Sequence, residues 1–205
     1  MNLSSIEQAI GSVATGHSVI VMDESGEVES NLIVAAEMAT PEAMAFLIRY
    51  SSGLVCVAMP GDRLDELRLP LMVARDAPGT GTAFTISADY RYGTSTGISA
   101  CDRSATIRAL ARASAKADDF VRPGHVFPLR CEPGGVLRRR GYGEAASDLA
   151  RLAGLYPAAA LCEIANDDGT IARRHDISRF RRRPWLAYHH GLRPRGLPQG
   201  LRTLP

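Results

Sequence analysis

A histidine and a glutamate, each next to apolar residues, are the side chains of this sequence best suited to proton transfer. His125 lies in RPGHVFPLR and Glu163 lies in ALCEIANDDG. A carboxylate inside an apolar strand is costly to bury unless it has a partner. A His–Glu pair supplies that partner and can also move protons near neutral pH. The alternative for His125 is a structural role in which it only forms hydrogen bonds.

An acidic segment follows the apolar run SVIVM and predicts a cation site. In DESGEVES, residues Glu24, Glu27 and Glu29 fall on one short loop after this strand. Divalent cations such as Mg²⁺ bind several oxygen ligands close together, and a loop at the end of a strand can present them. The alternative is a solvated acidic loop without a ligand.

Two segments have the composition of phosphate-binding loops. RRRGYGE places Arg138, Arg139 and Arg140 before Gly141 and Gly143, ahead of a predicted helix start. TSTGISACDR places hydroxyls and a glycine before another helix. Backbone N–H groups at a helix start, together with a guanidinium, bind phosphate well. An exposed basic turn is the alternative for the first segment.

The elements that must position these residues alternate irregularly between helix and strand. Apolar spacing predicts a helix over 3–13, and Thr40 and Pro41 predict the start of a second helix that ends near Gly53. Further helices are predicted over 102–117, capped by Asp102 or Ser104, and from 144 to about 154. Apolar runs predict strands at 18–22, 54–59 and within 157–164. We therefore expect an α+β fold, an irregular α/β sandwich in a single domain.

The composition and the cysteine usage are those of a soluble globular protein. The 205 residues are 45% hydrophobic and 22% charged, which suits one domain with a sizeable core. No run approaches the roughly 18 apolar residues of a membrane helix, so we expect a cytosolic protein. The cysteines form no C-x-x-C motif and are expected to be reduced. Apolar neighbours predict burial for Cys56, Cys101 and Cys162.

The charges are distributed unevenly along the chain. Residues 1–48 hold seven acidic side chains and no Lys or Arg, whereas residues 170–205 hold nine arginines and one acid, Asp176. A basic end can bind an anionic partner. This end is also rich in Pro and Gly and lacks periodicity, so we expect a solvated tail over 184–205 after a domain over 1–183, and no nucleic-acid binding.

Taken in order, these segments resemble the 3,4-dihydroxy-2-butanone 4-phosphate synthase family from about residue 3 to residue 174. The resemblance rests above all on RPGHVFPLR and CEIANDDGT, with LIVAAEMATPEAM and TAFTISADYRYGTSTGISACDR. It implies a homodimeric α+β enzyme of riboflavin synthesis. Such an enzyme converts D-ribulose 5-phosphate into dihydroxybutanone phosphate and formate with Mg²⁺ and no organic cofactor.

The resemblance also implies roles for individual residues. His125 and Glu163 match the family's essential histidine and glutamate, and Arg139 matches the arginine of its substrate loop. Glu27 matches the metal-binding glutamate, with Glu24 or Glu29 as a further ligand. The other substrate-binding candidates are Asn31, Gly141, Gly143 and Cys56.

Four positions depart from the family pattern. Gly26 stands where the substrate-binding arginine is expected, and Asn31 where the catalytic aspartate is expected. Tyr142 replaces a metal-binding histidine, and Gly143 replaces a threonine that contacts phosphate. A phenol must lose its proton, with a pKa of about 10, before it binds a cation well. We therefore expect weakened Mg²⁺ binding, with Tyr142 as a new acid–base candidate or a wall of the pocket.

These departures lead to one main functional hypothesis and two alternatives. The main hypothesis is a divergent lyase or isomerase that acts on ribulose 5-phosphate or a related ketopentose by enolisation or dehydration, with an altered metal and acid–base site. The first alternative is the formate-releasing synthase of riboflavin biosynthesis itself. The second is a catalytically silent paralogue that serves as a dimerisation or regulatory partner.

Overall fold

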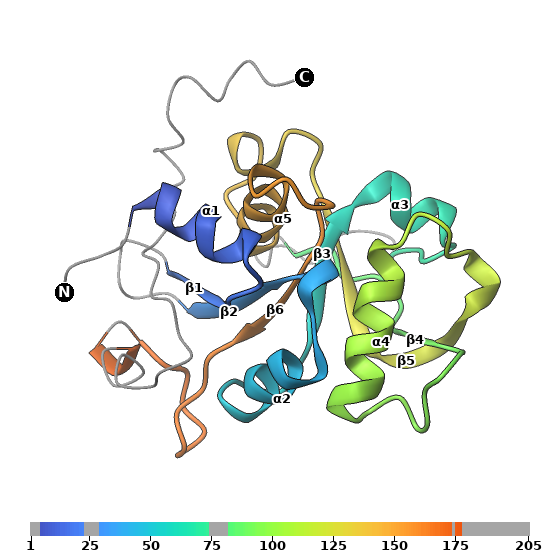
Figure 1. Ribbon diagram of the computed structural model, residues 1–205, viewed down its shortest axis with the longest axis horizontal. Helices are drawn as coiled ribbons and strands as arrows, with labels where there is room; N and C mark the ends of the chain where they lie inside the picture. The colour runs from blue at the N-terminus through green and yellow to red at the C-terminus, as the bar shows by residue number, and fades with distance from the viewer. Residues whose placement is uncertain (1–4, 23–28, 74–81, 174, 178–205) are drawn as a thin grey trace.

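A computed structural model describes residues 5–22, 29–73, 82–173 and 175–177, and Figure 1 shows a central sheet with helices on both faces. In these ranges the strands are β1 (Val19–Met22), β2 (Ser30–Ala35), β3 (Cys56–Pro60), β4 (Ala88–Tyr90), β5 (Phe120–Cys131) and β6 (Ala159–Glu163). The α-helices are α1 (Ile6–Ala14), α2 (Pro41–Arg49), α3 (Gly61–Glu66), α4 (Ala100–Ala111) and α5 (Tyr142–Leu152). Short 3₁₀ turns are η1 (Ala36–Met38), η2 (Ala117–Asp119) and η3 (Gly135–Leu137).

The sheet is mixed, and its strand order is β1-β2-β6-β3-β5-β4. Strand β3 pairs in parallel with β5 and antiparallel with β6, so two segments distant in sequence flank it. The remaining neighbours, β1 with β2, β2 with β6 and β4 with β5, are antiparallel. Sequence neighbours are therefore not always sheet neighbours, which is the α+β arrangement predicted from the sequence.

Two hydrophobic cores lie on the two faces of the sheet. Alternate strand residues such as Ile33, Ala58 and Leu161 pack against α1 and α5. The residues between them, such as Val34 and Val57, pack against α2, α3 and α4. Side chains on a strand point alternately to the two faces, so buried strands such as VIVM are apolar throughout.

The predicted helix starts are confirmed at α2 and wrong at α4. Thr40 caps α2 by accepting a hydrogen bond from the N–H of Ala43, and Pro41 is the first helical residue. Helix α4 begins at Ala100, earlier than predicted, because Ser99 caps it. It also ends at Ala111 rather than residue 117. Asp102 therefore lies inside the first turn, and its carboxylate does not cap the helix but accepts hydrogen bonds from the preceding segment.

The expected burial of the cysteines is partly wrong. Cys56 and Cys162 are buried as predicted, but Cys101 is exposed and Cys131 is buried. Cys101 is on the outer side of the first turn of α4, whereas Cys131 ends β5 inside the core under α5. Within the described residues, no helix is long and apolar enough to cross a membrane. The predicted domain boundary at residue 183 and the basic tail lie outside the described residues.

The central strand provides a test of this packing. Met59 on β3 has no exposed surface, whereas Met72 is 49% exposed. Shortening Met59 leaves a cavity between the sheet and its helices, so Met59→Ala is expected to lower the free energy of unfolding by about 3 kcal/mol. Met72→Ala is the matched control and is expected to change it by less than about 0.5 kcal/mol. Urea denaturation at one protein concentration measures both, and equal losses would contradict this description of the core.

Candidate active site

Four of the predicted site residues lie on one face of the sheet, on two neighbouring rows. Asn31 on β2 is the register partner of Glu163 on β6. Cys56 on β3 pairs with Leu161 on one side and Phe127 on the other, so Glu163 and His125 each lie two residues beyond these partners. All of them fall on the α5 face of the sheet. Because β3 separates their strands, the main chains at His125 and Glu163 are about 10 Å apart.

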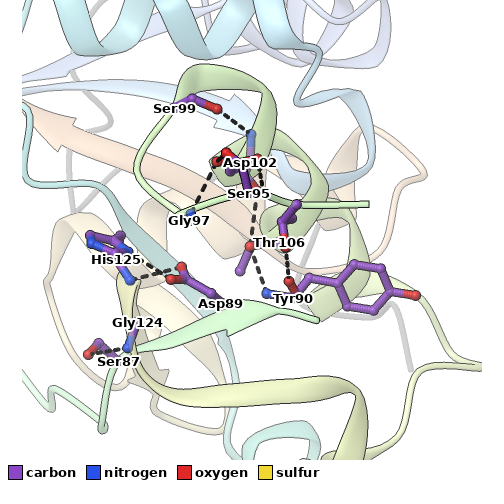
Figure 2. Close-up of polar contacts among 11 residues, drawn as sticks. Ser87, Asp89, Tyr90, Ser95, Gly97, Ser99, Asp102, Thr106, Gly124 and His125 are labelled. Carbon is purple, nitrogen blue, oxygen red and sulfur yellow. Dashed lines mark hydrogen bonds and ion pairs between the residues drawn. The ribbon is translucent and has the colours of Figure 1, made fainter. Parts of the chain in front are cut away.

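The imidazole of His125 is held by Asp89 rather than by Glu163. Its Nδ1 is 2.7 Å from Oδ2 of Asp89, and its main-chain N–H donates to Oδ1 over 2.9 Å (Figure 2). The Asp89 side chain is 12% exposed and that of His125 is 41% exposed. A carboxylate only accepts hydrogen bonds, so this contact places the proton on Nδ1 and leaves Nε2 available. The predicted His125–Glu163 pair is therefore wrong: the register places the two residues on strands either side of β3.

A glycine allows β5 to approach β4 closely enough for this contact. A Cβ on Gly124 would lie 2.2 Å from the carbonyl carbon of Ala88 and 2.3 Å from the nitrogen of Asp89. The N–H of Gly124 donates to Oγ of Ser87 over 3.1 Å. The β4–β5 pairing shifts register between Ala88 and Asp89 at this point. The close approach turns the Asp89 carboxylate toward His125.

Glu163 has an environment that disfavours its ionised form. Oε1 of Glu163 is buried and has no hydrogen-bond partner among the described residues. Burial raises the pKa of this carboxyl, and the charge of Glu29 and a hydrogen bond with its side chain raise it further. Two carboxyl groups that share a site favour one proton between them. Glu163 is thus a carboxyl that retains a proton to higher pH than an ordinary glutamate.

Cys56 contributes an uncharged wall to the same site. Burial raises the pKa of its thiol to about 12, and the nearby Cys162 and Glu163 raise it in the same direction. A thiol with such a pKa stays protonated at neutral pH and is neither a strong nucleophile nor a good metal ligand. Cys56 lies close to Glu163, and its chemistry there is that of a small apolar group.

Tyr142 and its neighbours belong to the first turn of α5. The helix begins at Tyr142, two residues earlier than predicted, and Gly141 is its N-cap residue. The hydroxyl of Tyr142 donates to the main-chain carbonyl of Glu29, just before β2. A Cβ on Gly143 would lie 3.6 Å from Cβ of Ala58, so the helix start lies directly on the sheet. Tyr142 therefore ties the start of β2 to the start of α5.

Arg139 precedes α5 and is held by Glu144, a buried residue in the first turn of that helix. Its Nε donates to Oε1 of Glu144 over 2.8 Å, and its Nη2 donates to the carbonyl of Arg130 over 2.7 Å. Glu144 is 2% exposed and also accepts the N–H of Glu132. The pair with Glu144 raises the pKa of Arg139 although burial acts in the opposite direction. Arg139 is thus a fixed cation near the start of α5.

Several predicted residues cannot be placed. Glu24, Gly26 and Glu27 lie outside the described residues, so the predicted acidic metal site is represented only by Glu29. In the described part of the chain, no group of three or more His, Cys, Asp or Glu side chains could hold a metal ion. The contact between Glu29 and Glu163 is the one pairing of carboxyl groups at this edge of the sheet that the described residues give.

Sequence reasoning missed Asp89 and Arg103. Asp89 lies in TISADY, where Ser87 and Asp89 alternate with other residues, and this alternation was the signal available in the sequence. Arg103 on α4 is 6% exposed, and its Nη1 donates to the carbonyl of Gly53 over 3.0 Å. Burial lowers the pKa of Arg103, while the charges of Cys162 and Asp89 raise it. No local pattern marks this arginine.

The sequence and the fold match those of a known protein family. The sequence profile described as 3,4-dihydroxy-2-butanone 4-phosphate synthase matches residues 7–191. The chain belongs to the 3,4-dihydroxy-2-butanone 4-phosphate synthase family. This confirms the resemblance found in the sequence and the predicted α+β fold class.

Individual family members are similar over most of the chain. A 3,4-dihydroxy-2-butanone 4-phosphate synthase of Agrobacterium fabrum is 51% identical over 193 residues, which are 94% of this chain and 88% of that protein. The riboflavin biosynthesis protein RibBA of Nocardia farcinica is 54% identical over 178 residues, 85% of this chain. The chain spans only 43% of that RibBA protein. A crystal structure of a family member with two magnesium ions has a TM-score of 0.86 and 42% identity, covering 92% of this chain and 93% of that one.

The hypothesis of a divergent enzyme with altered chemistry is wrong. Identity of 51% over 94% of the chain to a synthase of this family is too extensive for that hypothesis, which rested on four substituted positions. Two of the four, Asn31 and Tyr142, are built into the fold through the pairing with Glu163 and the bond to Glu29. The formate-releasing synthase is the hypothesis that the comparisons support.

The raised pKa of Glu163 predicts how its replacement changes stability with pH. The folded state binds this proton more tightly than the unfolded chain, so the stabilising contribution is complete below pH 4.5 and is lost as pH rises through the folded pKa. In metal-free buffer, Glu163→Gln is therefore expected to melt at a higher temperature than the parent at pH 7, with the gap closing below pH 4.5.

Glu42→Gln is the control of opposite sign. The Glu42 carboxylate accepts hydrogen bonds from its own N–H and from the side chain of Thr40 at the start of α2, and these bonds lower its pKa. Its replacement should lower the melting temperature at pH 7 and have no effect at low pH. Thermal melting across pH measures both variants, and a Glu163→Gln protein that melts below the parent at pH 7 would contradict the assignment.

Proposed function

We propose that this chain is a 3,4-dihydroxy-2-butanone 4-phosphate synthase that converts D-ribulose 5-phosphate into dihydroxybutanone phosphate and formate. The observation that carries the proposal is the half-exposed His125, fixed by Asp89, on the same row of the sheet as the protonatable Glu163. Family membership supports the same reaction. The chemistry requires a base to form an enediol and an acid to assist loss of water.

His125 is the proposed base. Asp89 engages Nδ1, so Nε2 is the nitrogen that takes a proton from a carbon or hydroxyl of the sugar. The negative charge of Asp89 stabilises the imidazolium that results. The exposure of His125 leaves room for a substrate to approach the ring.

Glu163 is the proposed acid. Its raised pKa keeps a proton available closer to neutral pH, where the sugar must lose a hydroxyl group as water. Asn31 lies beside it in register and can hydrogen-bond a sugar hydroxyl through its amide. The protonated thiol of Cys56 excludes water from the same side.

The start of α5 is the proposed phosphate site. No side chain caps the start of α5 at Gly141, and the helix dipole favours an anion there. Arg139 adds a positive charge that Glu144 and the Arg130 carbonyl hold in place. This assignment keeps the predicted substrate-binding role of Arg139, Gly141 and Gly143.

Magnesium fits the carboxylates at this edge of the sheet. Glu29 lies beside the protonatable Glu163, and Mg²⁺ binds through one or two carboxylates while it retains water. When bound, Mg²⁺ would stabilise negative charge on oxygens of the sugar. The Tyr142 phenol offers no nitrogen ligand, and its hydroxyl donates to a main-chain carbonyl. We therefore propose weak binding through Glu29, with Glu27 as a predicted further ligand.

Assembly and location stay predictions. We propose a homodimer in the cytosol, as the resemblance and the composition imply. Sedimentation velocity tests the dimer, and a monomer at micromolar concentration would contradict it. Fractionation of cells that express the chain tests its location.

Formate release tests the proposed reaction. Purified protein with ¹³C-labelled ribulose 5-phosphate and Mg²⁺ is expected to yield formate and dihydroxybutanone phosphate in equal amounts by NMR. His125→Ala is expected to lower kcat by about 10²- to 10⁴-fold, because the general base is lost. His175→Ala, at a histidine whose side chain is 77% exposed, is the matched control and should leave kcat unchanged. Loss of substrate without formate would contradict the proposal.

The proposed weak metal binding has its own test. Removal of Mg²⁺ with EDTA should abolish turnover, and added Mg²⁺ should restore it. Tyr142→His offers a neutral nitrogen ligand and is expected to lower the Mg²⁺ concentration for half-maximal activity several-fold. Tyr142→Phe has neither the phenol hydroxyl nor a nitrogen ligand and is the control. Equal Mg²⁺ dependence of the Tyr142→His protein and the parent would contradict a carboxylate-only site.

A further inference from the structure

The carboxylate of Asp102 organises the turn that precedes α4. Asp102 is 4% exposed, and its Oδ1 accepts the N–H of Ser95 over 3.0 Å. Its Oδ2 accepts the hydroxyl of Ser95 over 2.8 Å and the N–H of Gly97 over 3.1 Å. These bonds lower the pKa of Asp102 to about 2, with the N–H of Ser95 as the largest cause. The carboxylate therefore stays ionised and keeps the turn in one conformation at neutral pH.

The helix that carries Asp102 is itself tied to the strand that carries Asp89. The hydroxyl of Thr106 donates to the carbonyl of Asp102 over 3.0 Å and accepts the N–H of Tyr90 over 2.9 Å. Tyr90 follows Asp89 on β4. The position of Asp102 relative to Asp89 is thus fixed through α4 as well as through the turn.

Gly97 is the residue of this turn that lies against the hydrogen-bonded pair of Asp89 and His125. Figure 2 shows Gly97 between Asp102 and the Asp89–His125 pair. A Cβ on Gly97 would lie 1.9 Å from Oδ2 of Asp89 and 2.7 Å from Nδ1 of His125. Its φ of +92° is also in the region that favours glycine. The backbone of Gly97 therefore covers the hydrogen bond between Asp89 and His125 at van der Waals distance.

We propose that Asp102 is a positioning residue that acts through the Ser95–Gly97 turn: it holds Gly97 against the Asp89–His125 pair and so fixes the orientation of the His125 ring. The turn leaves no space beside Oδ2 of Asp89 for a competing water molecule. It also blocks rotation of the ring toward the turn. Proton transfer is sensitive to such placement, because a displacement of about 1 Å can lower a rate about 100-fold.

The kinetic test compares variants of the turn and rests on the proposed function. Asp102→Asn removes an acceptor with little change in shape, and Gly97→Ala inserts a methyl group into the pair. Both are expected to lower kcat by about 10- to 100-fold while KM changes by less than about threefold. Gly93→Ala is the matched control: Gly93 lies in the same segment at φ +70°, but its Cβ would meet nothing within 4 Å. It should keep the parent kcat.

A second readout does not depend on activity. The ¹⁵N signals of the imidazole, assigned with His125→Ala, report the tautomer and the hydrogen bond to Asp89. They should shift in Asp102→Asn and Gly97→Ala and stay in place in Gly93→Ala. If Gly97→Ala does not fold, Asp102→Asn and Ser95→Ala, which removes one donor to Asp102, decide the question, with partial effects expected for Ser95→Ala.

The outcomes separate this inference from the proposed function. Unchanged His125 signals and kcat in folded Asp102→Asn protein would overturn the positioning role, even if its melting temperature falls. If the His125 signals shift in the variants but the parent protein releases no formate, the positioning role is supported and the proposed reaction is rejected.

Discussion

The pairing of β3 with β5 on one side and β6 on the other is the constraint on which the site depends. It joins two segments that are distant in the chain, Phe120–Cys131 and Ala159–Glu163, and sets both against one short buried strand. Main-chain hydrogen bonds fix the register, and a slip of one residue would turn every side chain to the opposite face. His125 and Glu163 therefore face the same side of the sheet only while Cys56 keeps both of its partners. The two hydrophobic cores, one on each face, hold that register in place.

The polar groups of the site fall into two kinds with different effects on stability. Asp102 and Glu144 are buried acids with several donors each, so they stabilise the turn before α4 and the start of α5. Glu163 has a buried oxygen without a partner among the described residues, so its ionised form destabilises the fold. Buried polar groups whose hydrogen bonds are all made, such as Asp102 and Glu144, keep their surroundings rigid around the unsatisfied Glu163. The rigid groups orient the reactive ones.

The four departures from the family pattern do not by themselves indicate a different reaction, because the new side chains make contacts of their own. Tyr142 loses a metal ligand but gains a bond to the main chain at Glu29, and Asn31 keeps its place beside Glu163. Whether a substitution removes an activity depends on what the new side chain contacts, and a single sequence does not contain that information. Extensive identity over the whole chain is the stronger observation, because it includes the residues that hold the site together.

The apolar strands, the start of α2 at Thr40 and Pro41, the fold class and the candidate residues His125 and Glu163 could all be predicted from the amino-acid sequence. These follow from local rules: side-chain periodicity, capping and the cost of an unpaired carboxyl in an apolar run. Only the tertiary structure decided that His125 pairs with Asp89, that Asp102 organises a turn rather than capping a helix, and that Arg139 is held by Glu144. Such contacts depend on which strands become neighbours and on close approaches at Gly97 and Gly124, and the physical reason is that long-range packing sets those distances.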